Sequence, residues 1–154
     1  MVVCIFGESC TGKTTLANAL KERLDARVFS GKDYLRLAKS EAEAKACFAE
    51  MLKSADSNLI YVVSEKDQLD LLPKNCLRVL ARADIALIKE RFAQRMWGSK
   101  NGEKNGEKLP PPIEKMLDAK HGSFDGETYD IVFESGKDDI DALCGLIMAK
   151  RGSI

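Results

Sequence analysis

The feature that most restricts the fold is a glycine-rich segment near the start of the sequence, Gly7-Glu-Ser-Cys-Thr-Gly-Lys-Thr14. A continuous apolar run, residues 2–6, precedes it, and such a run is typical of a strand buried on both faces of a parallel sheet. Residues 14–24 follow with apolar side chains at helical spacing, which predicts a helix with one buried face. A tight turn between a buried strand and an amphipathic helix indicates an α/β protein.

The segment fits the pattern G-x-x-x-x-G-K-[ST], the P-loop, in which each fixed position has a physical role. Two glycines let the backbone N–H groups surround a phosphate, and the following helix directs its partial positive charge to the same point. Lys13 supplies a cation for the phosphates, and Thr14 offers a hydroxyl to Mg²⁺. The pattern therefore predicts that ATP and Mg²⁺ are bound by consecutive residues of this segment: Gly7, Glu8, Ser9, Cys10, Thr11, Gly12, Lys13, Thr14 and Thr15.

The rest of the chain alternates between strand and helix patterns. Further strands are predicted at 26–29, 58–63, 77–80 and 129–133, and further helices at 33–53, 84–96, 113–120 and 138–150. The helical stretch 33–53 should break near Ser40, where Ser40 and Glu43 form a capping box. This order predicts a three-layer α/β P-loop fold, with a five-stranded parallel sheet and helices on both faces. The length, 154 residues, predicts a single domain over 1–154.

One stretch breaks this alternation. The tetrapeptide Asn101-Gly-Glu-Lys is repeated at once from Asn105, and three prolines follow at 110–112. The repeat has no apolar side chain to bury, so we expect a mobile loop. It lies within a segment, about 98–122, that we predict to form a lid.

Composition gives no support to several classes of protein, although a small local basic patch stays open. Acidic and basic residues balance at 24 each, which gives no support to a nucleic-acid-binding or membrane-surface role. The five cysteines are widely spaced, which predicts small buried residues in a reducing compartment, without disulfides or zinc. No apolar run approaches the ~18 residues of a membrane span, and the first residues lack the features of a signal peptide. We expect a cytoplasmic monomer or weak homodimer whose partner is a small molecule.

The chain resembles the P-loop small-molecule kinases, especially the nucleoside-monophosphate (adenylate- and guanylate-type) kinase group. Beside the P-loop, residues Phe29-Ser-Gly-Lys-Asp-Tyr-Leu-Arg36 are similar to the stretch after strand two in adenylate kinases, which holds the acceptor nucleotide. The segment 88–95 resembles the R-x-x-x-R helix that leads into the lid, whose arginines contact the transferring phosphate. The resemblance implies ATP-dependent transfer of the γ-phosphoryl group to a small, anionic, nucleotide-like acceptor. It further implies acceptor binding by Ser30, Asp33 and Arg36, and catalytic roles for Lys13, Arg91, Arg95 and Asp33.

The sequence departs from those kinases at two places. They carry an acidic residue at the end of strand three that organises magnesium. Here that strand ends in Ser64-Glu65, so Glu65 or Ser64 must take this role, and we expect Glu65 to be the metal residue beside Thr14. They also carry a Gly and an Arg just beyond this strand, where this chain has Lys66-Asp67-Gln68. The identity of the acceptor therefore stays open.

Each of these residues also has a simpler interpretation. Glu65 fits a solvated loop carboxylate, Asp33 a helix N-cap and Arg36 a solvated helix face. His121, where the lid helix ends, fits a helix C-cap better than a catalyst. A nucleotide-binding switch or NTPase without a small-molecule acceptor is the alternative function, although the paired arginines favour a kinase.

Overall fold

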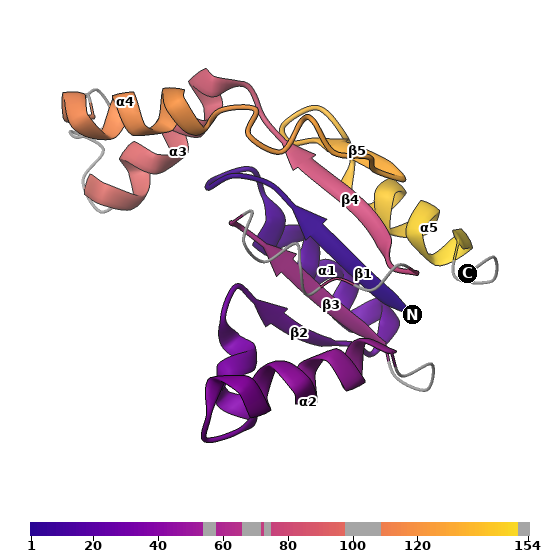
Figure 1. Cartoon of the computed structure of the whole chain (residues 1–154). Coiled ribbons are helices and arrows are strands. Elements are labelled where there is room, and N and C mark those ends of the chain that lie inside the picture. The colour runs from indigo at the N-terminus through magenta and orange to yellow at the C-terminus, as the bar shows by residue number, and fades with distance from the viewer. Residues whose placement is uncertain (54–57, 66–71, 73–74, 98–108, 151–154) are drawn as a thin grey trace.

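A computed structural model of the chain describes residues 1–53, 58–65, 72, 75–97 and 109–150. Within these residues, five parallel strands form one sheet in the order β2-β3-β1-β4-β5 (Figure 1). The strands are β1 (Val2–Phe6), β2 (Arg27–Ser30), β3 (Leu59–Val63), β4 (Leu77–Arg82) and β5 (Ile131–Glu134). The prediction of an α/β P-loop fold with a five-stranded parallel sheet is confirmed.

The described helices follow the predicted alternation. They are α1 (Lys13–Leu24), the 3₁₀ helix η1 (Asp33–Leu37), α2 (Glu41–Lys53), α3 (Ile85–Trp97), α4 (Pro111–Lys120) and α5 (Ile140–Lys150). The break near Ser40 is present, and the Ser40 Oγ accepts a hydrogen bond from the Glu43 N–H at 3.2 Å. Strand β2 begins one residue later than predicted because the Ala26 N–H bonds the Lys21 carbonyl at the end of α1.

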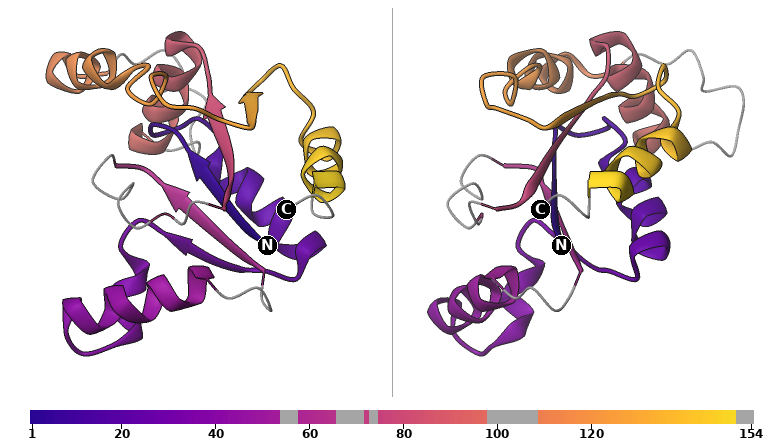
Figure 2. Two further views of the ribbon diagram at one scale, coloured as in Figure 1. Left: turned by 45° about the vertical axis from the view of Figure 1, so that its right-hand side comes forward. Right: turned by 90° about the vertical axis from the view of Figure 1, so that its right-hand side faces the viewer.

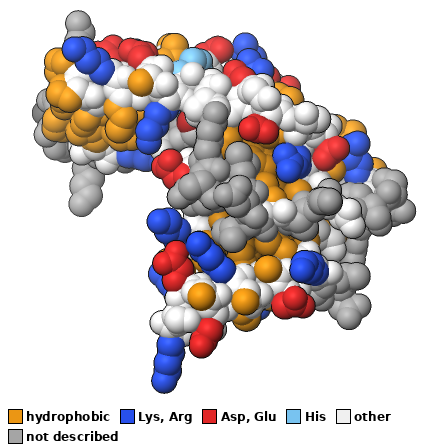
Figure 3. Space-filling model, in the orientation of Figure 1, with side chains coloured by type: hydrophobic (Ala, Val, Ile, Leu, Met, Phe, Trp, Pro, Cys, Tyr) orange, Lys and Arg blue, Asp and Glu red, His pale blue; other side chains and the backbone are white. Residues whose placement is uncertain are grey.

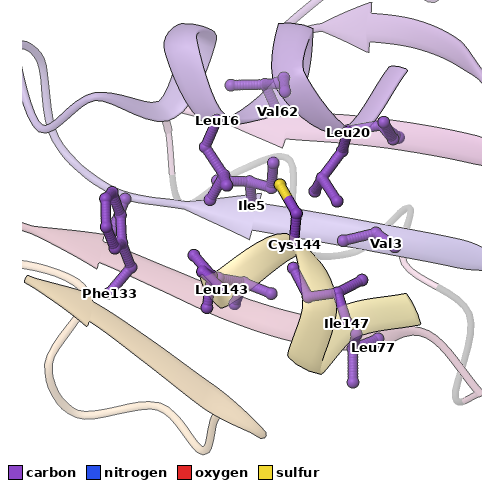
Figure 4. Close-up of a cluster of buried hydrophobic side chains, with 14 of the residues drawn as sticks. Val3, Ile5, Leu16, Leu20, Val62, Leu77, Phe133, Leu143, Cys144 and Ile147 are labelled. Carbon is purple, nitrogen blue, oxygen red and sulfur yellow. The ribbon is translucent and has the colours of Figure 1, made fainter. Parts of the chain in front are cut away.

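The sheet divides the core into two layers because successive side chains of a strand point to opposite faces. Val3 and Ile5 of β1 lie in one cluster with residues of α1 and α5, among them Leu16 and Ile147 (Figure 4). The alternate residues of β1 lie in a second cluster on the other face, together with Phe48 of α2. The five-residue run 2–6 is buried throughout, as expected for a central parallel strand.

Four of the five cysteines are buried, but Cys47 lies exposed on α2, so the prediction of buried cysteines is wrong at that position. Its place on the helix explains this, because the core-facing residues of α2 are Ala44, Phe48 and Leu52. All five cysteines carry free thiols, in line with the expectation that they form no disulfide framework.

Helices α3 and α4 form a separate layer beyond the carboxyl end of the sheet (Figures 1 and 2). They pack together through Ile88 and Leu117, and Lys89 on α3 contacts Glu114 and Asp118 on α4 at 3.1 and 2.9 Å. The described part of the predicted lid is therefore a helix packed on α3, whereas the Asn-Gly-Glu-Lys repeat lies outside the described residues. None of the described helices combines the length and apolar character needed to cross a bilayer.

Candidate functional site

The glycine-rich loop joins the central strand β1 to α1 at the carboxyl end of the sheet, where parallel α/β sheets bind their ligands. Gly7 lies against β4: a Cβ atom there would come within 2.5 Å of the Ala81 carbonyl oxygen, so no side chain fits. Gly12 caps α1 in the left-handed region, with φ of 88°, which glycine adopts without strain. Both glycines of the motif are therefore required by the local geometry.

Cys10, between these glycines, also has a left-handed backbone, with φ of 66°. For a residue with a Cβ this conformation costs about 1–2 kcal/mol. Its side chain is 4% exposed and packs among residues of α3 and α4, including Ile88 and Leu117. The Cys10 side chain thus packs the loop against α3 and α4, as expected of a small buried residue.

Lys13 is buried in the loop, with 7% of its surface exposed. Its ammonium donates a hydrogen bond to the Glu8 carbonyl at 2.5 Å, and the Thr11 hydroxyl donates to the same oxygen at 2.8 Å. Burial lowers the pKa of Lys13 to about 8, while the charges of Glu8 and Glu65 act against this shift and that of Arg95 adds to it. A desolvated ammonium bound to a neutral carbonyl is well suited to receive a phosphate, which would restore its charge balance.

Of the two arginines of α3, Arg91 bonds this loop, and both line one cavity beside it, as their spacing of four on one helix face permits. Arg91 donates from Nη1 to the Cys10 carbonyl at 2.9 Å and to the Ser135 hydroxyl at 2.8 Å. Arg91 and Arg95 line the same cavity. This cavity has a volume of about 290 Å³ and borders Gly12 and Thr15 of the loop. The turn after β5, at Ser135 and Gly136, also lines this cavity. This turn was missed from the sequence, because its residues match no motif and reach the loop only through the fold.

The predicted magnesium residues are both accessible. Thr14 and Glu65 are exposed, at the start of α1 and just after β3. The carboxylate charge of Glu65 acts on Lys13, which places it within electrostatic reach of the loop, and its Oε1 lies 3.9 Å from Nζ of Lys120. The described residues contain no cluster of three or more His, Cys, Asp or Glu side chains arranged to hold a metal. A hydroxyl and a carboxylate with solvent access fit Mg²⁺, which keeps several waters and takes its other ligands from phosphates.

Of the predicted acceptor residues, Ser30 ends β2, and Asp33 and Arg36 lie on η1 directly after it. Strand β3 separates β2 from β1 in the sheet. The Asp33 carboxylate accepts a hydrogen bond from the Ser30 N–H at 3.0 Å, so it shapes the turn that begins η1. Arg36 is exposed on η1. Figure 3 shows the molecular surface hollowed between this region and the layer of α3 and α4. Acceptor binding by these three residues stays a prediction.

His121 ends α4, as expected of a C-cap residue, but its side chain also has a partner that the sequence did not reveal. Its Nδ1 lies 2.7 Å from the Glu8 carboxylate, and the N–H of Gly122 donates to the other carboxylate oxygen at 2.9 Å. These contacts join positions 113 and 114 residues apart in the chain. Sequence spacing gives no signal for such a contact.

Comparison with known proteins identifies the fold. No protein-family profile and no curated protein sequence matches the chain. Among solved structures, a gluconokinase from Sinorhizobium meliloti 1021 is 14% identical with a TM-score of 0.60, over 99% of this chain and 91% of the other. Shikimate kinase from Acinetobacter baumannii, in complex with shikimate, is 13% identical with a TM-score of 0.60, over 99% and 93%. The chain has the fold of the P-loop small-molecule kinases.

A third similar structure is the YorR protein of Bacillus subtilis in complex with phosphorylated GDP. It is 17% identical with a TM-score of 0.59, over 97% of this chain and 94% of the other. At such identities the likeness extends to the fold alone. The nucleoside-monophosphate kinase group is one branch of this fold, and these three likenesses do not single it out.

Proposed function

We propose that this chain is an ATP- and Mg²⁺-dependent phosphotransferase that moves the γ-phosphoryl group to a small anionic acceptor. The observation that carries the proposal is the convergence of three cationic side chains from two elements on one glycine-rich loop. Lys13 lies buried in the loop, Arg91 bonds the Cys10 carbonyl, and Arg95 lines the adjoining cavity. Phosphoryl transfer depends mainly on positioning and on neutralising the charge of the phosphoryl oxygens, so such an arrangement suits it.

The nucleotide would occupy both the loop and the cavity next to it. The β- and γ-phosphates would take the N–H groups of the loop and draw the Lys13 ammonium away from the Glu8 carbonyl. A cavity of about 290 Å³ beside Gly12 and Thr15 has room for part of the nucleoside, between the α3 arginines and the Ser135 turn. Thr14 and Glu65 would hold Mg²⁺, which neutralises charge on the phosphate oxygens when bound.

The acceptor would lie on the other side of the loop, in the hollow between η1 and α4 (Figure 3). Exposed basic residues occur in the elements named, Lys32 and Arg36 at η1 and Lys120 at the end of α4, where its Nζ lies 3.9 Å from Glu65 Oε1. These charges favour an anionic acceptor, and a nucleoside monophosphate is one candidate of the required class. An oxygen of the acceptor would attack the γ-phosphorus as the bond to the bridging oxygen breaks and ADP leaves. Where this oxygen belongs to a hydroxyl, its proton would pass to Asp33 or to water.

Residues 98–122 would act as the lid, within a single domain that works as a monomer or weak homodimer. Its described part, α4, is joined to α3 through the Lys89 ion pairs, so a movement of the lid would be transmitted to the arginines on α3. A closing lid excludes water from the γ-phosphate, and this distinguishes a kinase from a hydrolytic switch.

A turnover assay with a panel of acceptors tests the proposal. ADP release from MgATP would be measured with the full chain, alone and with nucleoside monophosphates, hydroxy-acids and neutral alcohols. We expect ADP release to rise sharply with at least one anionic acceptor and little with neutral alcohols, and the phosphorylated product to appear in equal amount. Equal ADP release with and without every acceptor would support an NTPase instead, and no difference between wild type and Lys13→Ala would exclude both functions.

A further inference from the structure

The contact between the second residue of the phosphate loop and the end of α4 is not explained by phosphate binding. The Glu8 side chain is only 13% exposed, although glutamate is rarely buried without a partner. Both of its carboxylate oxygens are engaged, one with Nδ1 of His121 and one with the N–H of Gly122. We call this contact, made by Glu8, His121 and Gly122, the clasp.

The chemistry of the clasp is specific. A carboxylate facing the carboxyl end of a helix meets the negative end of the helix dipole, which is unfavourable by itself. Two short hydrogen bonds offset this, and since a carboxylate only accepts, Nδ1 of His121 must carry a proton. Gly122 has φ of 76°, and a Cβ atom there would lie 3.1 Å from Asp125 Oδ2. A residue with a side chain at position 122 would therefore be strained.

Glu8 also bonds the phosphate-binding lysine, through a different atom. Its main-chain carbonyl accepts from the Lys13 ammonium at 2.5 Å and from the Thr11 hydroxyl at 2.8 Å. One residue thus joins the cation of the loop, through its carbonyl, to the layer of α3 and α4, through its carboxylate. Two neighbouring contacts strengthen the same junction, the buried Cys10 side chain and the bond from Arg91 to the Cys10 carbonyl.

We propose that Glu8 is a positioning residue that couples the phosphate loop to α3 and α4 through the clasp. This inference rests on one part of the proposed function, the binding of a nucleotide phosphate by the loop. When phosphate takes the Lys13 ammonium, the Glu8 carbonyl loses its charged donor, and the clasp transmits the resulting shift to α4. The arginines on α3 are then brought to the transferring group in step with nucleotide binding, and Glu8 itself touches no reacting atom.

A double-mutant cycle tests whether the clasp forms. Glu8→Ala, His121→Ala and the double variant would be unfolded in urea without ligand. We expect the double variant to lose less stability than the two single variants lose together. Expressed in the unfolding equilibrium constant, this coupling should be about fivefold or more. Glu8→Gln should keep most of the stability, because its amide oxygen accepts from Gly122 while its NH₂ donates to the other tautomer of His121. Additive losses would overturn the clasp and leave the proposed function intact.

The emission of Trp97 tests the coupling. Trp97 is the only tryptophan of the chain, and it ends α3 with its indole nitrogen buried. With a saturating non-hydrolysable MgATP analogue, we expect the wild type to change its emission, and Glu8→Ala to lose more than half of that change while Glu8→Gln retains it. Glu43→Gln, which removes an exposed carboxylate on α2, is the matched control and should behave as the wild type.

Kinetics add a readout that a purely structural role would not move. We expect Glu8→Ala to lower kcat more than it raises the KM for ATP. A full Trp97 response in Glu8→Ala, or binding by the wild type without any Trp97 response, would overturn the coupling. Absence of binding by the wild type in calorimetry would overturn the proposed function and the coupling together, whereas the urea cycle would still decide whether the clasp exists. If Glu8→Ala fails to fold, His121→Ala breaks the same contact from the other side and takes its place.

Discussion

The loops that follow β1 and β2 end at the same edge of the sheet, yet they are held in different ways. Distant elements contact the loop after β1. The Ala81 carbonyl of β4 leaves no room for a side chain at Gly7. Arg91 of α3 bonds the Cys10 carbonyl, and His121 at the end of α4 bonds the Glu8 carboxylate. The turn after β2 is held by its own Asp33 and by the neighbouring strand β3. The Tyr61 hydroxyl donates to the Gly31 carbonyl, and the Gly31 N–H donates to the Val62 carbonyl.

This difference separates two kinds of site. The loop after β1 is preorganised by contacts from β4, α3 and α4, so changes within it should affect nucleotide binding and the lid together. We expect that changes in the turn after β2 leave those contacts intact. Changes there should affect only the acceptor, and the predictions below test this separation.

The largest effect is expected for Lys13→Ala. Removing a charge-assisted contact to phosphate costs about 1.5–3 kcal/mol or more, so nearly all ATP binding and turnover should be lost while the fold survives. Calorimetry with MgATP measures the affinity, and circular dichroism checks the fold. Lys21→Ala, an exposed lysine on the same helix, is the matched control. Equal affinities for wild type and Lys13→Ala would mean that the loop does not bind phosphate.

Arg95→Ala should act on the transition state more than on the bound ground state. Charge spreads over the γ-phosphoryl oxygens during transfer, so kcat should fall by about 10²–10³-fold with a modest change in ATP affinity. Steady-state kinetics with a saturating acceptor would measure this, with the neighbouring Gln94→Ala as control. An unchanged kcat would remove Arg95 from the site and weaken the contrast between the two loops.

Asp33→Asn and Arg36→Lys test the turn after β2. A lysine cannot reproduce a bidentate contact to a phosphate or carboxylate, and an asparagine still accepts the Ser30 N–H but cannot take a proton. We expect each change to lower acceptor-dependent turnover by about tenfold or more, with ATP affinity nearly unchanged. Lys39→Arg, at an exposed position of the same segment, serves as control. A loss of ATP binding in either variant would show that the two loops are not independent.

The smallest effect concerns the proton of Lys13. In the free protein burial lowers its pKa to about 8, and a bound phosphate should raise it again. At a pH between the pKa of Lys13 in the free protein and its higher pKa in the complex, the complex holds more protons than the free protein. Binding at pH 8.5 should therefore take up a proton, and the affinity for MgATP should fall as the pH rises. Calorimetry in two buffers of different ionisation enthalpy measures the uptake. Proton release on binding, or none, would contradict this account of Lys13.

The same pKa shift has a consequence for stability. An unfolded lysine keeps its ordinary pKa, so between pH 8 and 10.5 the unfolded chain binds more protons than the folded one. The contribution of Lys13 therefore makes the ligand-free protein more stable as the pH rises through this interval. Lys13→Ala should lack that contribution, and urea unfolding at several pH values in both proteins would detect the difference.

Much of the fold was predictable because its determinants are local. The apolar run 2–6, the glycines at 7 and 12 and the helical spacing after Lys13 each specify their own element, and five such elements in alternation require a parallel sheet. The errors are small. Strand β2 shifts by one residue, β4 extends two residues further than predicted, and β5 begins two residues later and ends one residue later. The first helical piece after β2 is a 3₁₀ helix, and Cys47 is exposed. Residues 98–108, with the predicted mobile repeat, lie outside the described part of the chain.

The candidate site was predictable only where one motif contains it. Residues 7–14 specify their own conformation, because the glycines permit it and the strand and helix on either side place it, and Arg91 and Arg95 share a face because helical spacing requires it. The contacts of Glu8 with His121, and of Arg91 with Ser135, depend instead on how β1, α3, α4 and β5 come together. Local sequence thus dictates the phosphate loop, and only the packing of distant elements decides which side chains surround it, since a contact across 113 residues leaves no pattern along the chain.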